Sequence, residues 1–443
     1  MNKYKNKKYC VVTYGCQMNV HDSEKIAGML EDLEMTSVKE PEDADVVVFN
    51  TCCIREGAED RAFSNIASLK KVKAQKPDMV IIVCGCMPQQ KQGKYDLKKK
   101  LPFVDIVIGT HNVNQIGAYL VRHAENNKRI HEIVETPIDL NEPKTTIRDD
   151  KINAYVNIIY GCNKFCTYCI VPHVRGRERS RPYADIEAEV KDLVKKGYRY
   201  ITLLGQNVNS YGKDLDKPID FATLLTRLCK IKGEFKLKFM TSHPIDFNKD
   251  VIKVMKNEPK VAKCLHLPVQ SGNDEVLFKM NRHYKIKHYN KLIRATKRAI
   301  KNIALSTDII VGFPGESEKA FEDTLKLIKK VKYDQVFAFM YSKRTGTPAC
   351  TLENQIDENV KNVRVNKLLR EQKFISKQLL NNCVGKTYNC LIVVQNGVTI
   401  GLTDGGREIY LPNDSNKLIN HFADVKVEGI RNHKLSGVIK CQK

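Results

Sequence analysis

The 443-residue sequence lacks long apolar runs. No stretch of about 18 or more apolar residues occurs, so a membrane-spanning helix is not expected. The N-terminal segment Met1–Lys8 is charged, but no apolar segment of signal-peptide length with a cleavage site follows it. These two absences predict a cytoplasmic protein. Its 42% hydrophobic and 28% charged residues are typical of a soluble chain, here with room for about two to four domains.

Acidic residues are also scarce relative to basic ones. The chain has 51 Asp and Glu against 74 Lys and Arg, which gives a formal net charge of +23. A basic surplus of this size favours a polyanionic partner, most simply a nucleic acid. The alternative is a set of solvated lysines on helix faces, which the charge alone does not exclude.

Cysteine, in contrast, is abundant, with 15 in the chain, and in a cytoplasmic protein this indicates metal binding or catalysis more than disulfides. Cys162, Cys166 and Cys169 follow a predicted strand at Ala154–Tyr160 with the spacing Cys-xxx-Cys-xx-Cys. Three such thiolates can bind three irons of a 4Fe–4S cluster. Because no fourth cysteine lies nearby, one iron would keep an open position for a substrate or cofactor. The alternative is a zinc site with His173 as its fourth ligand.

The segment before this motif alternates predicted strands and helices. Continuous apolar strands are expected at 9–14, 45–49, 79–83 and 104–108, with helices at 21–34 and 56–73. This βαβ pattern predicts an α/β domain with a parallel sheet covered on both faces. Sites in such sheets lie at the carboxyl ends of the strands.

A cysteine follows each of the first three predicted strands, namely Cys16, Cys52 and Cys86. Because these strand ends share one edge of the sheet, we expect the three thiolates to converge and to hold a second cluster. Glycine precedes Cys16 and Cys86, which lets the backbone approach a bulky ligand closely. The alternative is that these are ordinary buried thiols. That description fits three further cysteines better: Cys10, Cys53 and Cys84.

The second half of the chain predicts a partial barrel followed by a small one. Six strands at 154–160, 200–204, 238–240, 264–268, 306–311 and 335–341 alternate with helices. Six βα units are too few for a closed eight-stranded barrel, so an open (β/α)6 form with a side cleft is expected. After a helix at Asp357–Asn382, five short strands between 388 and 440 predict a small β-barrel, a fold that often binds RNA. The polar stretch 135–150 is interpreted as a linker.

Taken together, these features resemble the methylthiotransferases, a family of radical S-adenosylmethionine (SAM) enzymes. That family joins an N-terminal cluster domain, a radical SAM core and a C-terminal TRAM barrel, here expected at 7–124, 148–378 and 381–443. The resemblance covers essentially the whole chain. Besides the central cysteines, it rests on Tyr-Gly-Cys-Gln-Met-Asn at 14–19, Asn-Thr-Cys at 50–52, Gly-Cys-Met at 85–87, Arg-Gly-Arg-Glu-Arg-Ser-Arg at 175–181, Leu-Gly-Gln-Asn-Val-Asn-Ser-Tyr-Gly at 204–212, His-Leu-Pro-Val-Gln-Ser-Gly at 266–272 and Gly-Phe-Pro-Gly-Glu at 312–316.

The resemblance implies a transferase that inserts a methylthio group at C2 of N6-isopentenyladenosine, position 37 of tRNA. That carbon bears an unactivated C–H bond, which calls for radical chemistry supplied by a cofactor. The implied cofactors are SAM and two 4Fe–4S clusters, one of which cleaves SAM while the other carries the sulfur. Implied partners are tRNA and a flavodoxin- or ferredoxin-like electron donor, and a monomer is expected. The alternatives are a sister enzyme acting on threonylcarbamoyladenosine in tRNA or on a ribosomal protein, and a non-catalytic RNA-binding iron–sulfur protein.

Other candidate residues lie at strand ends and in basic stretches. Gln206 and Asn207 are placed to hold the methionine part of SAM, with loop hydrogen bonding as the alternative. Gly312 and Glu316 are placed to shape its adenosine side. Basic residues that can contact RNA phosphates, or form a solvated charge run, are Arg175, Arg177, Arg179, Arg181, Lys386, Arg407, Lys426 and Arg431.

Overall fold

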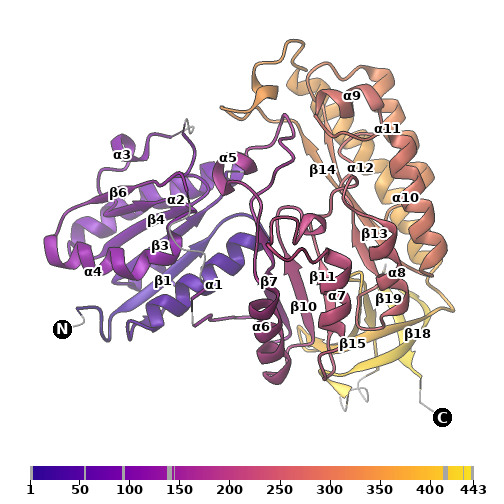
Figure 1. The fold of residues 1–443 in the computed structure, drawn as a ribbon, viewed down its shortest axis with the longest axis horizontal. Helices are drawn as coiled ribbons and strands as arrows, with labels where there is room; N and C mark the ends of the chain where they lie inside the picture. Colours follow the sequence, from indigo (N-terminus) through magenta and orange to yellow (C-terminus); the bar gives the residue numbers. More distant parts are fainter. Residues whose placement is uncertain are drawn as a thin grey trace. The chain divides into compact units, whose positions relative to one another are not determined.

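The computed structural model describes residues 3–53, 56–91, 95–136, 142–143, 145–412, 418–432 and 434–440. The chain forms two compact units (Figure 1). Unit 1 comprises Met1–Asp149, Tyr160–Glu178 and Ser342–Cys350, and unit 2 comprises Asp150–Ile159, Arg179–Tyr341 and Thr351–Lys443. The segment with the central cysteines therefore groups with the N-terminal residues. Part of the predicted linker, at 137–141 and 144, lies outside the described residues.

Unit 1 contains a six-stranded sheet in the order β2-β1-β3-β4-β5-β6, in which all neighbouring strands are parallel. This confirms the predicted parallel α/β sheet, and β3 and β4 are buried along their whole length. The strands are β1 (Lys8–Thr13), β2 (Thr36–Ser37), β3 (Val46–Thr51), β4 (Val80–Gly85), β5 (Ile106–Ile108) and β6 (Ile130–Glu132).

Helices cover both faces of this sheet. Ile26 and Leu30 of one helix and Leu120 of another belong to the apolar core on one face, while Ile66 and Leu69 belong to the core on the other. The helices of the unit are α1 (Gln17–Glu31), α2 (Glu56–Gln75), α3 (Leu97–Lys100), α4 (Ile116–Asn126) and α5 (Val171–Arg175).

Unit 2 contains the six parallel strands expected of the partial barrel, in two sheets ordered β11-β10-β7 and β12-β13-β14. A single parallel bridge joins Leu237 of β11 to Val261, just before β12, and one continuous core lies under both sheets. The strands are β7 (Asn153–Asn157), β10 (Tyr200–Leu204), β11 (Lys236–Phe239), β12 (Cys264–His266), β13 (Ala304–Val311) and β14 (Gln335–Met340).

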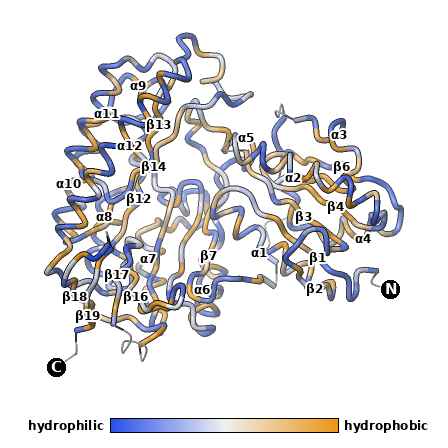
Figure 2. The backbone as a smooth tube through the Cα atoms, turned by 180° about the vertical axis from the view of Figure 1, so that it is seen from behind, coloured by the Kyte–Doolittle hydropathy of each residue, from blue (hydrophilic) through white to orange (hydrophobic). Residues whose placement is uncertain are grey.

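The helices of unit 2 are amphipathic, with one face on these sheets. In Figure 2 the tubes of α10 and α11 alternate between hydrophilic and hydrophobic colouring along their length. The helices are α6 (Tyr183–Lys195), α7 (Phe221–Cys229), α8 (Lys249–Asn257), α9 (Asp274–Lys279), α10 (Ile286–Ala299), α11 (Glu318–Val331) and α12 (Glu358–Asn381). None of the helices that the structure describes is long and apolar enough to cross a bilayer.

The C-terminal strands close into the predicted small barrel, in the order β15-β16-β17-β19-β18. Its apolar interior includes Ile392, Ile409, Val425 and Leu435. The strands are β15 (Thr387–Gln395), β16 (Val398–Thr403), β17 (Glu408–Tyr410), β18 (Phe422–Arg431) and β19 (Lys434–Ile439).

The turn between β16 and β17 docks this barrel on the rest of unit 2. The Asp404 carboxylate accepts hydrogen bonds from Tyr200 Oη (3.2 Å), Lys236 Nζ (2.8 Å) and the Lys263 backbone N–H (2.9 Å). These three groups start, or directly precede, β10, β11 and β12. The small barrel therefore covers the amino ends of the core strands, opposite the carboxyl ends where a site is expected.

Candidate functional site

The segment with Cys162, Cys166 and Cys169 forms a closed loop within unit 1. The Cys162 N–H donates to the Gly176 carbonyl (3.1 Å), and the Cys169 N–H donates to the Cys166 carbonyl (2.9 Å). Gly161 has a φ of 74°, and a Cβ there would lie 2.0 Å from the Arg177 carbonyl oxygen, so only glycine fits. The loop thus holds the three cysteines on one compact stretch of backbone, with Cys166 buried and the other two partly buried.

Arg177 and His173 both pack against the ring of Phe165 in this loop. Phe165 adopts a φ of 47°, and the Arg177 guanidinium lies 4.5 Å from the centre of its ring. The His173 ring approaches the same ring edge-on, with centroids 6.4 Å apart. His173 therefore packs against Phe165 in this structure. Burial raises the pKa of Cys162 to about 11, although the Lys164 N–H partly offsets it.

The three strand-end cysteines come together as the topology predicts. Cys16 is the N-cap residue of α1, three residues after the end of β1, and Cys52 and Cys86 directly follow β3 and β4. A Cβ on Gly15 would lie 2.8 Å from Cys52 Sγ, so the loops after β1 and β3 touch. Burial raises the pKa of Cys16, and the neighbouring Cys86 thiol adds to this effect.

A fourth thiol, that of Cys53, lies in this group. Cys53 is fully buried and packs with Cys86, Ile170 and Val174, apart from the two main cores of the unit. The interaction between the two thiols raises the pKa of Cys53 and lowers that of Cys86. Cys10 and Cys84, in contrast, belong to the cores on the two faces of the sheet, as expected of ordinary buried thiols.

Arg175, predicted to contact RNA, is buried beside these thiols. Its Nη1 donates to Asp22 (2.7 Å) and its Nη2 donates to Asn19 Oδ1 (2.9 Å). The positive charge of the guanidinium also lowers the pKa of the Cys86 thiol. A guanidinium engaged in this way is not presented to a phosphate, so the structure corrects the sequence-based expectation for Arg175.

The donor chemistry of both cysteine groups fits 4Fe–4S clusters. Each group supplies three thiols, with no fourth ligand required, and Gly15, Gly85 and Gly161 directly precede Cys16, Cys86 and Cys162. Among the described residues, no group of three His, Cys, Asp or Glu side chains is arranged to hold a single metal ion. A cubane cluster does not require three ligands to converge on one point, because each thiolate binds its own iron at a separate corner.

The carboxyl ends of the unit 2 strands carry buried polar atoms. Asn207, 1% exposed, donates through Nδ2 to Asp246 (2.7 Å), and its Oδ1 has no hydrogen-bond partner among the described residues. Glu316 Oε2 accepts from the Gly312 N–H (2.7 Å) and from Arg364 (2.8 Å), and its Oε1 likewise has no partner in the described part of the chain. Burial is the main cause of the raised pKa of Glu316.

The sequence did not single out three further atoms of this kind. They are Asn209 Nδ2, Ser242 Oγ and Gln270 Oε1, all buried and without a partner among the described residues. Leaving one such atom unsatisfied costs about 1–3 kcal/mol. Their concentration after β10, β11 and β12 therefore indicates that a polar ligand binds at this rim. Gln270 also has a φ of 69°, a strained conformation that is common at ligand sites.

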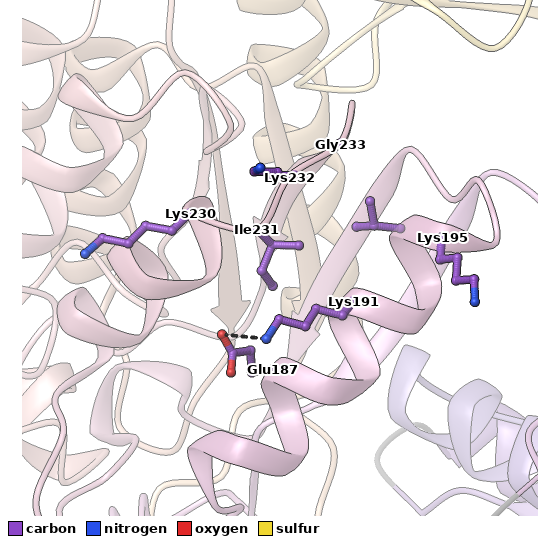
Figure 3. A pocket seen from close by; sticks show the side chains of 8 residues that line it. Glu187, Lys191, Lys195, Lys230, Ile231, Lys232 and Gly233 are labelled. Atoms are coloured by element: carbon purple, nitrogen blue, oxygen red, sulfur yellow. Dashed lines mark ion pairs between the residues drawn. The ribbon is translucent and has the colours of Figure 1, made fainter.

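Figure 3 shows a pocket of about 720 Å³ elsewhere on unit 2, lined by Lys191, Lys195, Lys230 and Lys232. Its one acidic lining residue, Glu187, pairs with Lys191 at 3.2 Å. The pocket lies between α6 and the segment that leads into β11. It therefore lies away from the carboxyl rim, and we assign it no part in the candidate site.

The other predicted RNA contacts differ in exposure. Arg181 is buried and donates to the Asn157 carbonyl (2.7 Å) and to Glu189 (2.8 Å), and Arg407 pairs with Asp334. These two arginines hold unit 2 together, which argues against phosphate contacts for them. Arg179 is partly buried, and four other members of the predicted set are exposed: Arg177, Lys386, Lys426 and Arg431.

Two protein-family models match parts of this chain. Residues 8–109 match the model described as Uncharacterized protein family UPF0004, and residues 156–328 match the Radical SAM superfamily. A radical SAM methyltransferase, TsrM, from Kitasatospora setae, solved with tryptophan and a SAM analogue, has a similar fold. Its TM-score is 0.58 at 10% identity, over 88% of this chain and 79% of that one.

Fold and site together define a radical SAM enzyme with a 4Fe–4S cluster and SAM as cofactors. Two similar curated proteins, both named tRNA-2-methylthio-N(6)-dimethylallyladenosine synthase, identify the family within this class of enzymes. The one from Clostridium botulinum (strain Langeland) is 46% identical over 97% of this chain and 96% of its own length. The one from Clostridium perfringens (strain SM101) is 43% identical over 99% of both. The chain belongs to the tRNA-2-methylthio-N(6)-dimethylallyladenosine synthase family.

Proposed function

We propose that this protein inserts a methylthio group at C2 of N6-isopentenyladenosine at position 37 of tRNA. Membership in the synthase family supports this reaction. The observation that carries the proposal is the pair of three-cysteine groups, one on the closed loop 161–169 and one at the ends of β1, β3 and β4. We further propose that the protein acts as a cytoplasmic monomer and takes electrons from a flavodoxin- or ferredoxin-like donor.

In this proposal the two cysteine groups have different tasks. Cys162, Cys166 and Cys169 would hold the cluster that, with SAM, supplies the radical chemistry an unactivated C–H bond requires. Cys16, Cys52 and Cys86 would hold a second cluster that carries the sulfur. Gly15 and Gly85, with φ values of 120° and 95°, let the backbone of these strand-end loops pass close to such a group.

The carboxyl rim of unit 2 is the proposed SAM site. Asn207 Oδ1 and Glu316 Oε1 are acceptors suited to the ammonium and hydroxyl groups of SAM, and they have no other partner among the described residues. Gln206 precedes Asn207 and would take part in the same contacts. The Gly312 N–H and Arg364 fix the Glu316 carboxylate in place.

Deleting the gene should remove the methylthio modification from N6-isopentenyladenosine and leave the unmethylthiolated nucleoside in the tRNA. Mass spectrometry of nucleosides from total tRNA measures this directly, with a complemented strain as the control. Loss of the methylthio group from threonylcarbamoyladenosine, or from a ribosomal protein, would instead support a sister enzyme. An unchanged profile in all three would support a non-catalytic iron–sulfur protein.

The exposed basic residues of the small barrel are proposed to bind tRNA. Lys386 and Lys426 lie beside each other, because the Val427 N–H donates to the Lys386 carbonyl (2.9 Å), and Arg431 ends the same strand as Lys426. Changing these three to Gln should weaken tRNA binding and reduce its salt dependence by about one unit of slope per lost phosphate contact. Fluorescence anisotropy at several salt concentrations measures both.

A matched control for that experiment replaces three lysines of the pocket in Figure 3, Lys191, Lys195 and Lys232. It removes the same charge from the same unit. If this variant loses as much affinity and salt slope as the barrel variant, the effect comes from net charge, and the barrel has no specific role in binding tRNA.

A further inference from the structure

Arg175 connects the two cysteine groups of unit 1. It is the last residue of α5, the short helix that begins two residues after Cys169, and only 7% of its surface is exposed. Its guanidinium reaches Asp22 and Asn19 on α1, more than 150 residues earlier in the chain. The segment that carries one cysteine group therefore places a buried cation in the other.

Asn19 links the Arg175 guanidinium by hydrogen bonds to the loops that carry Cys16, Cys52 and Cys86. Its Nδ2 donates to the carbonyls of Tyr14 and Thr51, each at 2.9 Å, just before the turns that carry Cys16 and Cys52. The same Thr51 carbonyl accepts the Cys86 N–H at 2.9 Å. The position of Arg175 is therefore fixed relative to each of the three predicted ligands.

The charge of the guanidinium matters because the site would otherwise be strongly negative. Three thiolates and a reducible iron–sulfur core carry net negative charge, which is costly to bury without a counter-charge or hydrogen bonds. Arg175 has five N–H donors spread over a planar fork, so different nitrogens can serve Asp22, Asn19 and a sulfur ligand, whereas a lysine places its three donors on a single nitrogen. Hydrogen bonds to cluster sulfurs are among the factors that set reduction potential.

We propose that Arg175 is a positioning residue of the strand-end cluster, holding its three ligand loops in place and raising its reduction potential. The proposal rests on the proposed function, since it assumes that Cys16, Cys52 and Cys86 hold a cluster. By contrast Arg177, two residues further on, is exposed and stacks on Phe165, which makes it a matched control.

The test uses a full-length parent in which Cys162, Cys166 and Cys169 are Ala, so that only the strand-end cluster remains. Three variants of this parent are made. They are Arg175→Lys, the double change Asp22→Asn with Arg175→Gln, and the control Arg177→Gln. The double change removes the buried ion pair as a unit and so avoids an uncompensated charge. After anaerobic reconstitution, iron content and midpoint potential are measured on each sample.

We expect both Arg175 variants to have lower midpoint potentials than the parent, because the guanidinium fork beside the cluster is lost in each, while Arg177→Gln matches the parent. Loss of iron only in the Arg175 variants would also support the proposal, through the positioning role. Full iron with an unchanged potential in Arg175→Lys and in the double variant would overturn it, as would an equal shift in Arg177→Gln. A parent that binds no iron would overturn the second cluster itself, and with it the proposed function of these cysteines.

Discussion

Replacing Cys16, Cys52 or Cys86 with Ala should abolish the methylthiolated product while reductive cleavage of SAM continues near the wild-type rate. The reason is structural, because these cysteines follow β1, β3 and β4, whereas the loop at 161–169 has its own three thiols. Liquid chromatography with mass spectrometry quantifies 5′-deoxyadenosine and modified nucleoside in the same reaction. A variant that forms 5′-deoxyadenosine but no methylthiolated nucleoside shows that SAM cleavage and sulfur insertion depend on different cysteines.

Cys53 supplies the most informative control for this experiment. It neighbours Cys52 in sequence and its thiol contacts Cys86, so it tests which thiols are essential. We expect Cys53→Ala to keep forming product. If Cys53→Ala loses product while Cys52→Ala keeps it, the ligand assignment is wrong by one position. Normal product from Cys16→Ala, Cys52→Ala and Cys86→Ala alike would show these thiols to be structural.

Much of the fold could be predicted because the core strands are strongly apolar. β3 and β4 are buried on both faces, and such strands show continuous runs of Val, Ile and Phe. β6 was not predicted, because it has three residues and includes His131, so its place in the sheet depends on pairing with β5. The approach of Cys16, Cys52 and Cys86 to one another was predictable for a related reason, since the topology of a parallel sheet brings strand ends to one edge. Their role as cluster ligands stays a prediction.

The role of Arg175 could not be predicted from sequence. In the run at 175–181 it looks like any other solvated arginine, and its burial depends on Asp22 and Asn19, which are distant in sequence. The ion pair of Arg407 could not be predicted for the same reason, because its partner Asp334 precedes β14 in a different part of unit 2. The local sequence shows which residues are charged, but only the tertiary structure shows which of these charges are buried.

The docking of the small barrel changes how its function should be tested. Removing Cys383–Lys443 would take away Asp404 and leave the buried Lys236 and the Tyr200 hydroxyl without their acceptor. Truncation therefore combines loss of RNA contacts with damage to the amino ends of β10 and β11. Exposed charges such as Lys426 can be replaced without touching that interface, which is why point variants are preferable.

Replacing Cys162, Cys166 and Cys169 together with Ala should abolish both SAM cleavage and product. It should also lower iron content from about eight to about four per chain, if each group holds a 4Fe–4S cluster. The strand-end group should keep its iron, because its ligands come from β1, β3 and β4 and its supporting residues Asn19 and Thr51 are unchanged. Iron analysis and assays of 5′-deoxyadenosine on one reconstituted sample check all three expectations.

Cys229→Ala is the matched control for that triple variant, because Cys229 is a buried thiol in the core of unit 2, whereas both cysteine groups belong to unit 1. It should keep full iron and full SAM cleavage, so that any loss in the triple variant reflects the loop at 161–169. Iron that stays near eight in the triple variant would contradict the ligand assignment. Iron that falls close to zero would overturn the second cluster, and with it the proposed function of Cys16, Cys52 and Cys86.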